Sequence, residues 1–189
     1  RAVQFDRAYC QQAVCNPSRS SMLTGRRPDT LRLWNNSVHF RELNPDVTTL
    51  PLHFKQHGYT TLRTGKIFHG GYDDTDAWHE GGEPRPQGNA DRKGSSQVPG
   101  QSDRIVVLEG DGETHGDYKS GTRAIEYLRT HGRGDRPFFI ACGFSKPHSP
   151  PTAPKKFFDL YPVENTQLPA DFAAKPKAPA GFPERSVPA

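Results

Sequence analysis

The feature that most constrains the fold is a helical pattern followed directly by an apolar run. Residues 118–130 have small or apolar side chains at i, i+3, i+4 and i+7, the spacing of one helix face, and Gly132 would end that helix. The four residues on this face are Gly121, Ala124, Ile125 and Leu128. The run 138–142, Phe-Phe-Ile-Ala-Cys, is typical of a strand buried on both faces. A helix leading into such a strand indicates a parallel sheet covered by helices, so the sequence predicts an α/β fold.

Capping residues predict two more helices in the N-terminal third of the chain. Asn16 is a favourable N-cap, Pro17 suits the first helical position, and Gly25 suits the position after the helix. A second helix is expected over 49–57, with a proline in its first turn and Gly58 as its stop.

Alternation and turn residues predict two further strands. The opening stretch 2–10 alternates well enough for a short strand, with Val3, Phe5 and residues 8–10 partly buried. The stretch 59–71 fits a strand that runs into a glycine-bounded loop. Strand and helix signals therefore alternate along the chain, as an α/β fold requires.

Glycine and proline, 18 residues of each among 189, predict long loops. Residues 70–102 are polar and rich in Gly, Pro, Asp and Glu, and we expect them to form a long surface loop. The chain is rich in proline and alanine again near its C-terminal end. The sequence thus divides into 1–165, which contains the predicted core elements, and a loop segment over 166–189.

Charge and cysteine content argue against several classes of protein. The net charge of +4 comes from 25 basic and 21 acidic residues spread along the chain, so no basic tract indicates a nucleic-acid partner. No apolar run approaches the length of a membrane span. The three cysteines are odd in number and lack metal-like spacing, so neither a disulfide framework nor a zinc site is indicated. We expect Cys10 and Cys142 to be small buried residues.

Three pairs of chemically active residues follow predicted strands. They are Cys15 with Arg19, Lys66 with His69, and Lys146 with His148. Because ligands bind at the carboxyl ends of strands in open α/β sheets, we expect the three pairs to share one site. Asp73, Asp74 and Asp76 resemble a metal cluster, but a solvated turn is the favoured interpretation.

Cys15 would lie at the start of a helix, where backbone N–H groups and the helix dipole favour negative charge. With Arg19 four residues later, the arrangement resembles the loop of a thiolate phosphatase. However, no glycine-rich cradle separates the two residues, and Pro17 and Ser18 remove or redirect hydrogen-bond donors. A buried structural cysteine beside a helix cap is the other interpretation that the residues leave open.

The same stretch, CNPSR followed by SSMLTG, is similar to the C-x-P-S-R-x-x-x-[LM]-T-G signature of type I sulfatases, members of the alkaline-phosphatase superfamily. The resemblance covers about residues 5–72 and 113–165, and it is strongest to the iduronate-2-sulfatase branch. It implies a mostly parallel sheet with helices on both faces and long loops. It also implies that residues 1–165 form part of a sulfatase catalytic domain.

In that family a maturation enzyme oxidises the signature cysteine to Cα-formylglycine, and it reads the residues equivalent to Pro17 and Arg19. The resemblance therefore implies that Cys15 becomes both the nucleophile and a calcium ligand, while Arg19 would steady the formylglycine hydrate. One hydroxyl of the hydrate would attack sulfur, and the other would lose a proton so that sulfate can leave. A cysteine or serine has no second hydroxyl for that last step.

The resemblance also implies roles for the other pairs. Lys66 and His69 would stand on opposite sides of the sulfuryl group, with His69 as the base that releases sulfate. His148 would protonate the departing oxygen, and Lys146 would help to bind the sulfate charge.

The family's remaining calcium ligands lie on either side of these motifs, and they have no counterpart in this chain. The resemblance therefore predicts an internal segment, truncated at both ends, of a longer sulfatase, and a segment inactive by itself. A sulfated saccharide is the expected substrate, and a secreted, periplasmic or lysosomal location is implied. A non-catalytic relative that binds sulfated glycans is the alternative, and a thiolate-dependent phosphatase is a less favoured one.

Overall fold

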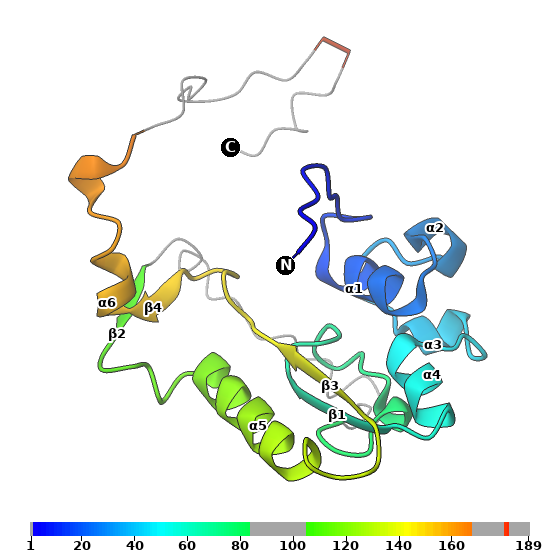
Figure 1. Cartoon of the computed structure of the whole chain (residues 1–189). Coiled ribbons are helices and arrows are strands. Elements are labelled where there is room, and N and C mark those ends of the chain that lie inside the picture. The colour runs from blue at the N-terminus through cyan, green and yellow to red at the C-terminus, as the bar shows by residue number, and fades with distance from the viewer. Residues whose placement is uncertain (1, 84–104, 168–179, 182–189) are drawn as a thin grey trace.

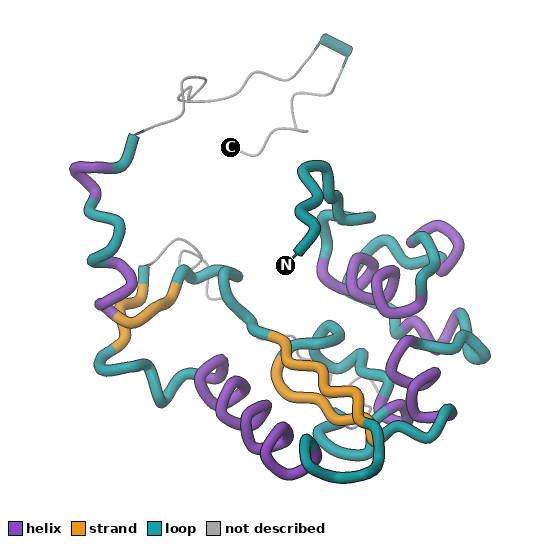
Figure 2. The backbone as a smooth tube through the Cα atoms, in the orientation of Figure 1, coloured by secondary structure: helices purple, strands orange, loops and turns teal. Residues whose placement is uncertain are grey.

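The computed structural model describes residues 2–83, 105–167 and 180–181 (Figure 1). The longer strand pair joins β1 (Thr60–Gly65) to β3 (Phe138–Gly143) in parallel. The shorter pair, also parallel, joins β2 (Val106–Leu108) to β4 (Thr152–Pro154). Figure 2 shows the two pairs as separate groups of orange segments. The parallel pairing agrees with the sheet type predicted from sequence.

The described part of the chain also contains six α-helices. They are α1 (Cys15–Thr24), α2 (Pro28–Leu31), α3 (Phe40–Leu43), α4 (Leu50–Gln56), α5 (Gly116–His131) and α6 (Lys155–Phe158), with 3-10 turns at Thr75–Ala77 and Val163–Asn165. Of these helices, α4 and α5 contact the longer strand pair, and α6 contacts β4. The predicted proline in the first turn of α4 and the predicted glycine after α5 are confirmed, and α4 also has a side-chain cap that was not predicted. The Thr49 hydroxyl accepts a hydrogen bond from the Leu52 N–H, and Gly132 follows α5. None of the described helices is long and apolar enough to cross a membrane.

The β1–β3 pair has a helix on each face, as expected (Figure 1). Phe54 of α4 stacks on Phe139 of β3 with ring centroids 4.6 Å apart. On the other face, the buried Tyr127 of α5 donates a 3.4 Å hydrogen bond to the Arg63 carbonyl oxygen. Because successive strand residues point to opposite faces, this arrangement fixes which residues of β1 and β3 face each helix.

The hydrophobic core lies on the α4 side of the pair. It joins α1, α2 and α3 to the segment that follows β1, and consists of Leu23, Leu31, Leu33, Phe40, Val47, Ile67, Phe68 and Trp78. The rings of Phe40 and Phe68 stack with centroids 5.4 Å apart. Ile67 and Phe68 belong to the loop that contains Lys66 and His69, so core packing anchors that loop between its two candidate residues.

The start of α1 lies two residues before the predicted one. The helix begins at Cys15 after an N-cap at Val14, and no side chain caps it. Asn16 is buried inside the first turn, where its amide donates to the carbonyl oxygens of Asn35 and Val38 at 3.1 and 2.8 Å. The prediction of Asn16 as N-cap is wrong because its side chain instead holds the loop before α3.

The predicted N-terminal strand is absent from the described residues. Residues 2–10 form no helix or strand and are exposed, with Val3 and Phe5 at 79% and 77%. A strand is stable only beside a neighbour, and neither described strand pair extends to this segment.

The apolar face predicted for α5 is rotated from the one that packs. Ile125 and Leu128 are about half exposed, at 49% and 51%, whereas Ser120 and Tyr127 are buried. The helix passes so close to the strand ends that a Cβ added at Gly65 would lie 2.7 Å from the Ser120 hydroxyl oxygen. This contact requires a small side chain at position 120, a requirement that hydrophobic periodicity does not register.

Burial of β3 and of the cysteines is also less than predicted. Residues 138–141 are half-buried rather than buried on both faces, and Cys10 and Cys142 are exposed. The Cys142 side chain points towards α5, where its thiol lies 3.9 Å from the Ser120 carbonyl oxygen.

The interpretation of Asp73 and Asp74 as a solvated turn is wrong, while Asp76 is exposed as expected. Asp74 accepts two hydrogen bonds from the Arg41 guanidinium at 2.8 and 3.1 Å and one from Thr49 at 2.6 Å. The beginning of the predicted 70–102 surface loop is therefore packed. Residues 84–104 and most of 166–189 lie outside the described residues.

Candidate active site

Two glycines bring the ends of β1 and β3 together. Gly65 is paired with Gly143 in the strand register and has a positive φ of 70°. A Cβ at Gly65 would lie 1.9 Å from the Gly143 carbonyl oxygen, and one at Gly143 would lie 1.9 Å from the Lys66 carbonyl oxygen. The Lys66 N–H donates to the Gly143 carbonyl oxygen at 2.9 Å. The loops that contain Lys66 and residues 144–150 therefore leave the sheet side by side.

Cys15 is the first residue of α1 and is half-buried. Its backbone belongs to the first turn, where N–H groups without helical partners and the helix dipole favour an anion. Arg19 lies four residues later, so both side chains project from the same face of the helix.

Arg19 connects α1 to the loop after β1. One nitrogen of its guanidinium, Nη1, donates to the carbonyl oxygens of Lys66 and Ile67 at 2.8 and 2.9 Å. Two of the three predicted pairs are thereby joined. The remaining guanidinium N–H groups leave Arg19 able to bind an anion as well.

The electrostatic surroundings of His69 are dominated by cations. Burial of the imidazole lowers the pKa of His69 below its usual 6.5, and the Lys66 ammonium lowers it further. Arg19 and His148 act in the same direction, whereas the Glu83 carboxylate raises the pKa. Residues from all three predicted pairs therefore influence one imidazole, as expected for a shared site.

The His69 ring is held on one side by Tyr72, with centroids 5.5 Å apart and planes 29° apart. Its Nδ1 atom is buried and has no hydrogen-bond partner among the described residues. A buried ring nitrogen without a protein partner is available to a ligand. His69 is therefore placed to accept a hydrogen bond or a proton at this atom if it lies in a binding site.

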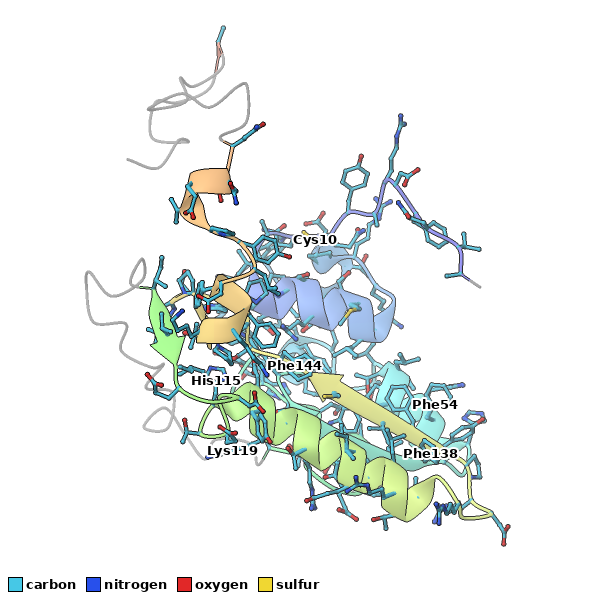
Figure 3. The ribbon with its side chains drawn as sticks, turned by 60° about the vertical axis from the view of Figure 1, so that its left-hand side comes forward. Cys10, Phe54, His115, Lys119, Phe138 and Phe144 are labelled. Carbon is cyan, nitrogen blue, oxygen red and sulfur yellow. The ribbon has the colours of Figure 1, made fainter. Side chains whose placement is uncertain are left out.

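The loop after β3 presents its two candidates differently. The Lys146 ammonium donates to the carbonyl oxygens of His148 and Pro150 at 2.9 and 2.7 Å, which leaves one of its three N–H donors. His148 is exposed, and its Nδ1 atom lies 2.8 Å from the Ser149 carbonyl oxygen. Figure 3 shows Phe144, at the start of this loop, beside the N-terminal end of α5 near His115.

Asp117 fixes this loop, and the sequence did not single it out. Its carboxylate accepts hydrogen bonds from the Ser145 N–H and hydroxyl at 2.7 and 2.9 Å and from the Lys146 N–H at 2.9 Å. Burial raises the pKa of Asp117, but these hydrogen bonds outweigh burial, so the pKa lies below its usual value. The only sequence signal was an acidic residue at the start of a predicted helix, which usually indicates a cap.

The described residues do not form a calcium site. No group of three or more His, Cys, Asp or Glu side chains among them is placed to hold a metal ion. Calcium needs about six or more oxygen ligands, and Asp73 and Asp74 already pair with arginines. Of the expected metal ligands, only position 15 lies in the described part of the chain.

The chain is an α/β protein in which a cysteine at a helix start lies with cationic side chains near the ends of parallel strands, an arrangement that suits an oxyanion. The Sulfatase family model matches residues 1–175, and the chain belongs to the sulfatase family. This membership confirms the resemblance seen in the signature and brings with it the alkaline-phosphatase-like α/β fold.

Curated relatives are similar over most of this chain. Human iduronate 2-sulfatase is 37% identical over 194 aligned residues, which cover 95% of this chain and 34% of that protein. A sulfatase of Formosa agariphila is 33% identical over 183 residues, which cover 88% of this chain and 36% of that protein. The Escherichia coli uncharacterized sulfatase YidJ is 26% identical over 93% of this chain. The chain spans about a third of the length of these relatives.

Proposed function

We propose that the complete gene product hydrolyses sulfate esters of a saccharide, and that this chain supplies the nucleophile position and several sulfate-binding groups. One observation supports this most directly. The Arg19 side chain on the signature helix hydrogen bonds to the backbone at Lys66 and Ile67, so the signature and the Lys66–His69 loop form one unit. Such a cationic unit at a helix start suits a tetrahedral oxyanion.

The proposal includes oxidation of Cys15 to formylglycine by a maturation enzyme, because the signature residues Pro17 and Arg19 are present. As a hydrate, that aldehyde supplies an oxygen nucleophile and a second hydroxyl through which sulfate can be released. The half-buried position at the first turn of α1 fits this residue, since the helix N-terminus stabilises negative charge there.

The other side chains bind charge and move protons. Lys66 and Arg19 neutralise the sulfate oxygens. His69 is neutral at physiological pH because its pKa is lowered, so it can accept a proton. His148 donates a proton to the departing sugar oxygen, and the exposure of its imidazole allows the proton to be replaced from solvent. The remaining N–H of Lys146 binds substrate.

Substrate, partners and location belong to the same proposal. The relatives named iduronate 2-sulfatase support a sulfated saccharide as substrate. The maturation enzyme is the one protein partner that the mechanism needs. A secreted, periplasmic or lysosomal location is proposed with it. Among the described residues only position 15 would contribute to a calcium site, since no group of three or more His, Cys, Asp or Glu side chains is placed to hold a metal ion.

Mass spectrometry of the peptide that spans Cys15 tests the proposal. In protein purified from the native host, we expect this peptide to be lighter by the difference between a thiol methylene and an aldehyde. The same preparation should release sulfate from an aryl sulfate, and the Cys15→Ala variant should not. An unmodified thiol in protein that releases no sulfate would contradict the proposal.

Two alternatives predict different results. A non-catalytic sulfated-glycan-binding protein would keep its Cys15 thiol and bind sulfated oligosaccharides without releasing sulfate. A thiolate phosphatase would hydrolyse aryl phosphates and lose that activity when Cys15 is alkylated.

A further inference from the structure

The peptide group between Gly65 and Lys66 is held from both sides. Its N–H, which belongs to Lys66, donates to the Gly143 carbonyl oxygen at 2.9 Å. Its carbonyl oxygen, which belongs to Gly65, accepts a hydrogen bond from the Arg63 guanidinium. Because both polar atoms of this peptide are engaged, its plane is fixed, and with it the direction in which Lys66 leaves the sheet.

Arg63 is an unusual residue for this position. It lies in the middle of β1 and is only 3% exposed. Buried positions of a strand usually carry apolar side chains, and arginine is rarely buried unless it is paired. Its Nη1 atom lies 2.7 Å from the buried carboxylate of Asp73, while its Nη2 atom donates to Glu83 at 3.0 Å. Removing a buried charge of this kind from its partners is costly, so the ion pairs hold the guanidinium in place.

Glu83 extends the same contacts to the far end of the loop. One carboxylate oxygen accepts from Arg63, and the other accepts from the Gly71 N–H at 3.3 Å. The backbone of Glu83 is fixed in turn, because its N–H donates to Asp73 at 2.7 Å and its carbonyl oxygen accepts from the Thr75 hydroxyl. These contacts hold both the side chain and the backbone of Glu83 in place beside the loop that follows β1.

The segment 66–70 is thus bounded by two contacts of one ion pair. Arg63 holds the peptide immediately before Lys66, and Glu83 holds the N–H of Gly71, two residues after His69. We propose that Arg63 and Glu83 are positioning residues, which set the separation and orientation of Lys66 and His69 at the sulfate site. The expected effect of these residues on catalysis rests on the proposed function, whereas their expected effect on the pKa of His69 does not.

The charge of Glu83 adds a second effect that can be measured. Around His69 the structure places Lys66, Arg19 and His148, which lower its pKa together with burial, and Glu83, which raises it. A neutral isostere at position 83 therefore lowers the pKa of His69 further. A residue that served only to stabilise the fold would leave that titration unchanged.

The decisive variant is Glu83→Gln in the complete gene product. We expect kcat for an aryl sulfate to fall about tenfold, because catalytic groups displaced by a fraction of an ångström lose much of their effect. Selective 13C labelling of histidines should show His69 titrating at a lower pH than in the wild type. The His69 signal is assigned by its loss in His69→Gln.

Two further variants complete the experiment. Arg63→Met combined with Asp73→Asn removes both buried charges together, which avoids leaving one unpaired, and should lower kcat by on the order of 100-fold. Arg123→Met is the matched control, since it breaks an exposed arginine pair with Glu80 and Glu126, and should change kcat less than about twofold.

The outcomes separate the two proposals. If the wild-type protein releases no sulfate, the proposed function fails. The positioning role is then tested by comparing the titration of His69 in the wild type and in Glu83→Gln. If a folded Glu83→Gln protein keeps both the wild-type kcat and the wild-type titration of His69, the positioning role is overturned.

Discussion

Arg19 and Lys66, which lie 47 positions apart in the sequence, are joined by a hydrogen bond of 2.8 Å from the Arg19 guanidinium to the Lys66 carbonyl oxygen. The same nitrogen reaches the Ile67 carbonyl oxygen at 2.9 Å. Arg19, which the proposed maturation enzyme would read, therefore also joins α1 to the loop after β1. Its structural and chemical roles depend on one guanidinium.

Arg19→Lys should show whether the hydrogen bonds of the Arg19 guanidinium, and not only its positive charge, stabilise the fold. A lysine keeps the charge but lacks the planar fork that reaches two carbonyl oxygens and an anion together. We expect the free energy of unfolding to fall by about 1 to 2 kcal/mol, measured by urea denaturation of the complete gene product. The exposed Arg26, just after the same helix, is the control, and Arg26→Lys should leave the unfolding curve unchanged. Equal effects at the two positions would contradict the role of Arg19.

Gly65→Ala should damage the sheet end directly. Position 65 has a positive φ, which costs a non-glycine residue about 1–2 kcal/mol. The new methyl would also lie 1.9 Å from the Gly143 carbonyl oxygen, and overpacking of this kind costs about 1–3 kcal/mol. We expect the free energy of unfolding to fall by at least about 2 kcal/mol.

Gly116→Ala is the matched control for that substitution. Position 116 is the first residue of α5, and no atom lies within 4 Å of an added Cβ. Because alanine favours helices more than glycine does, this variant should be neutral or slightly stabilised. Thermal unfolding that ranks Gly116→Ala below Gly65→Ala would show that the close approach of β1 and β3 is not a constraint.

The sequence predicted the elements better than their environments. Local capping and periodicity were sufficient for α4, α5, β1 and β3, because those signals lie within the elements themselves. They failed at Asn16, which looks like a cap but binds the carbonyl oxygens of Asn35 and Val38. An asparagine can cap a helix or hydrogen bond to a distant segment, and the sequence is the same in both cases. Only the tertiary contacts show which role it has.

Charged residues in the candidate site show the same limit. The positions of Cys15, Lys66 and His148 were predictable because they follow strands or begin a helix. Asp73 looked solvated because it lies in a polar stretch, yet it is buried against Arg63. The arginine that makes its burial tolerable is ten residues away on β1, and no local pattern connects the two.

Asp117→Asn should loosen the loop that contains Lys146 and His148. Folding lowers the pKa of Asp117, so the unfolded chain binds the proton more readily. The stabilisation is therefore present above the carboxyl's unfolded pKa of about 3.9 and is lost as the pH falls through the lower, folded value. We expect Asp117→Asn to reduce the difference between the unfolding free energies at about pH 6 and about pH 3, which lie above and below the unfolded pKa.

Its control is Asp159→Asn, which breaks an exposed ion pair with Lys155 and should leave the pH dependence of stability almost unchanged. A second readout is catalytic, because a displaced His148 would protonate the leaving oxygen less efficiently. A wild-type pH dependence in Asp117→Asn would mean that the hydrogen bonds from Ser145 and Lys146 do not stabilise the carboxylate.

Lys66→Gln should raise the pKa of His69. Burial lowers this pKa most and Lys66 is the next cause, so removal of the ammonium restores part of the shift while burial keeps the value below 6.5. In the wild type the imidazole is neutral down to its lowered pKa, so activity that depends on His69 as a base should persist as the pH falls below 6.5. In Lys66→Gln the acidic limb of the pH profile of kcat should move to higher pH. Histidine NMR should show that His69 titrates at a higher pH than in the wild type.

Lys119→Gln is the control for this charge, since Lys119 is an exposed residue of α5. It should move neither the acidic limb nor the His69 titration. The sign of the expected effect distinguishes the interpretations of the site. A base beside a cation gains proton affinity when the cation is removed, whereas an imidazole that is merely buried does not respond. An unchanged His69 titration in Lys66→Gln would therefore separate Lys66 from His69 and remove the electrostatic argument that they share one sulfate site.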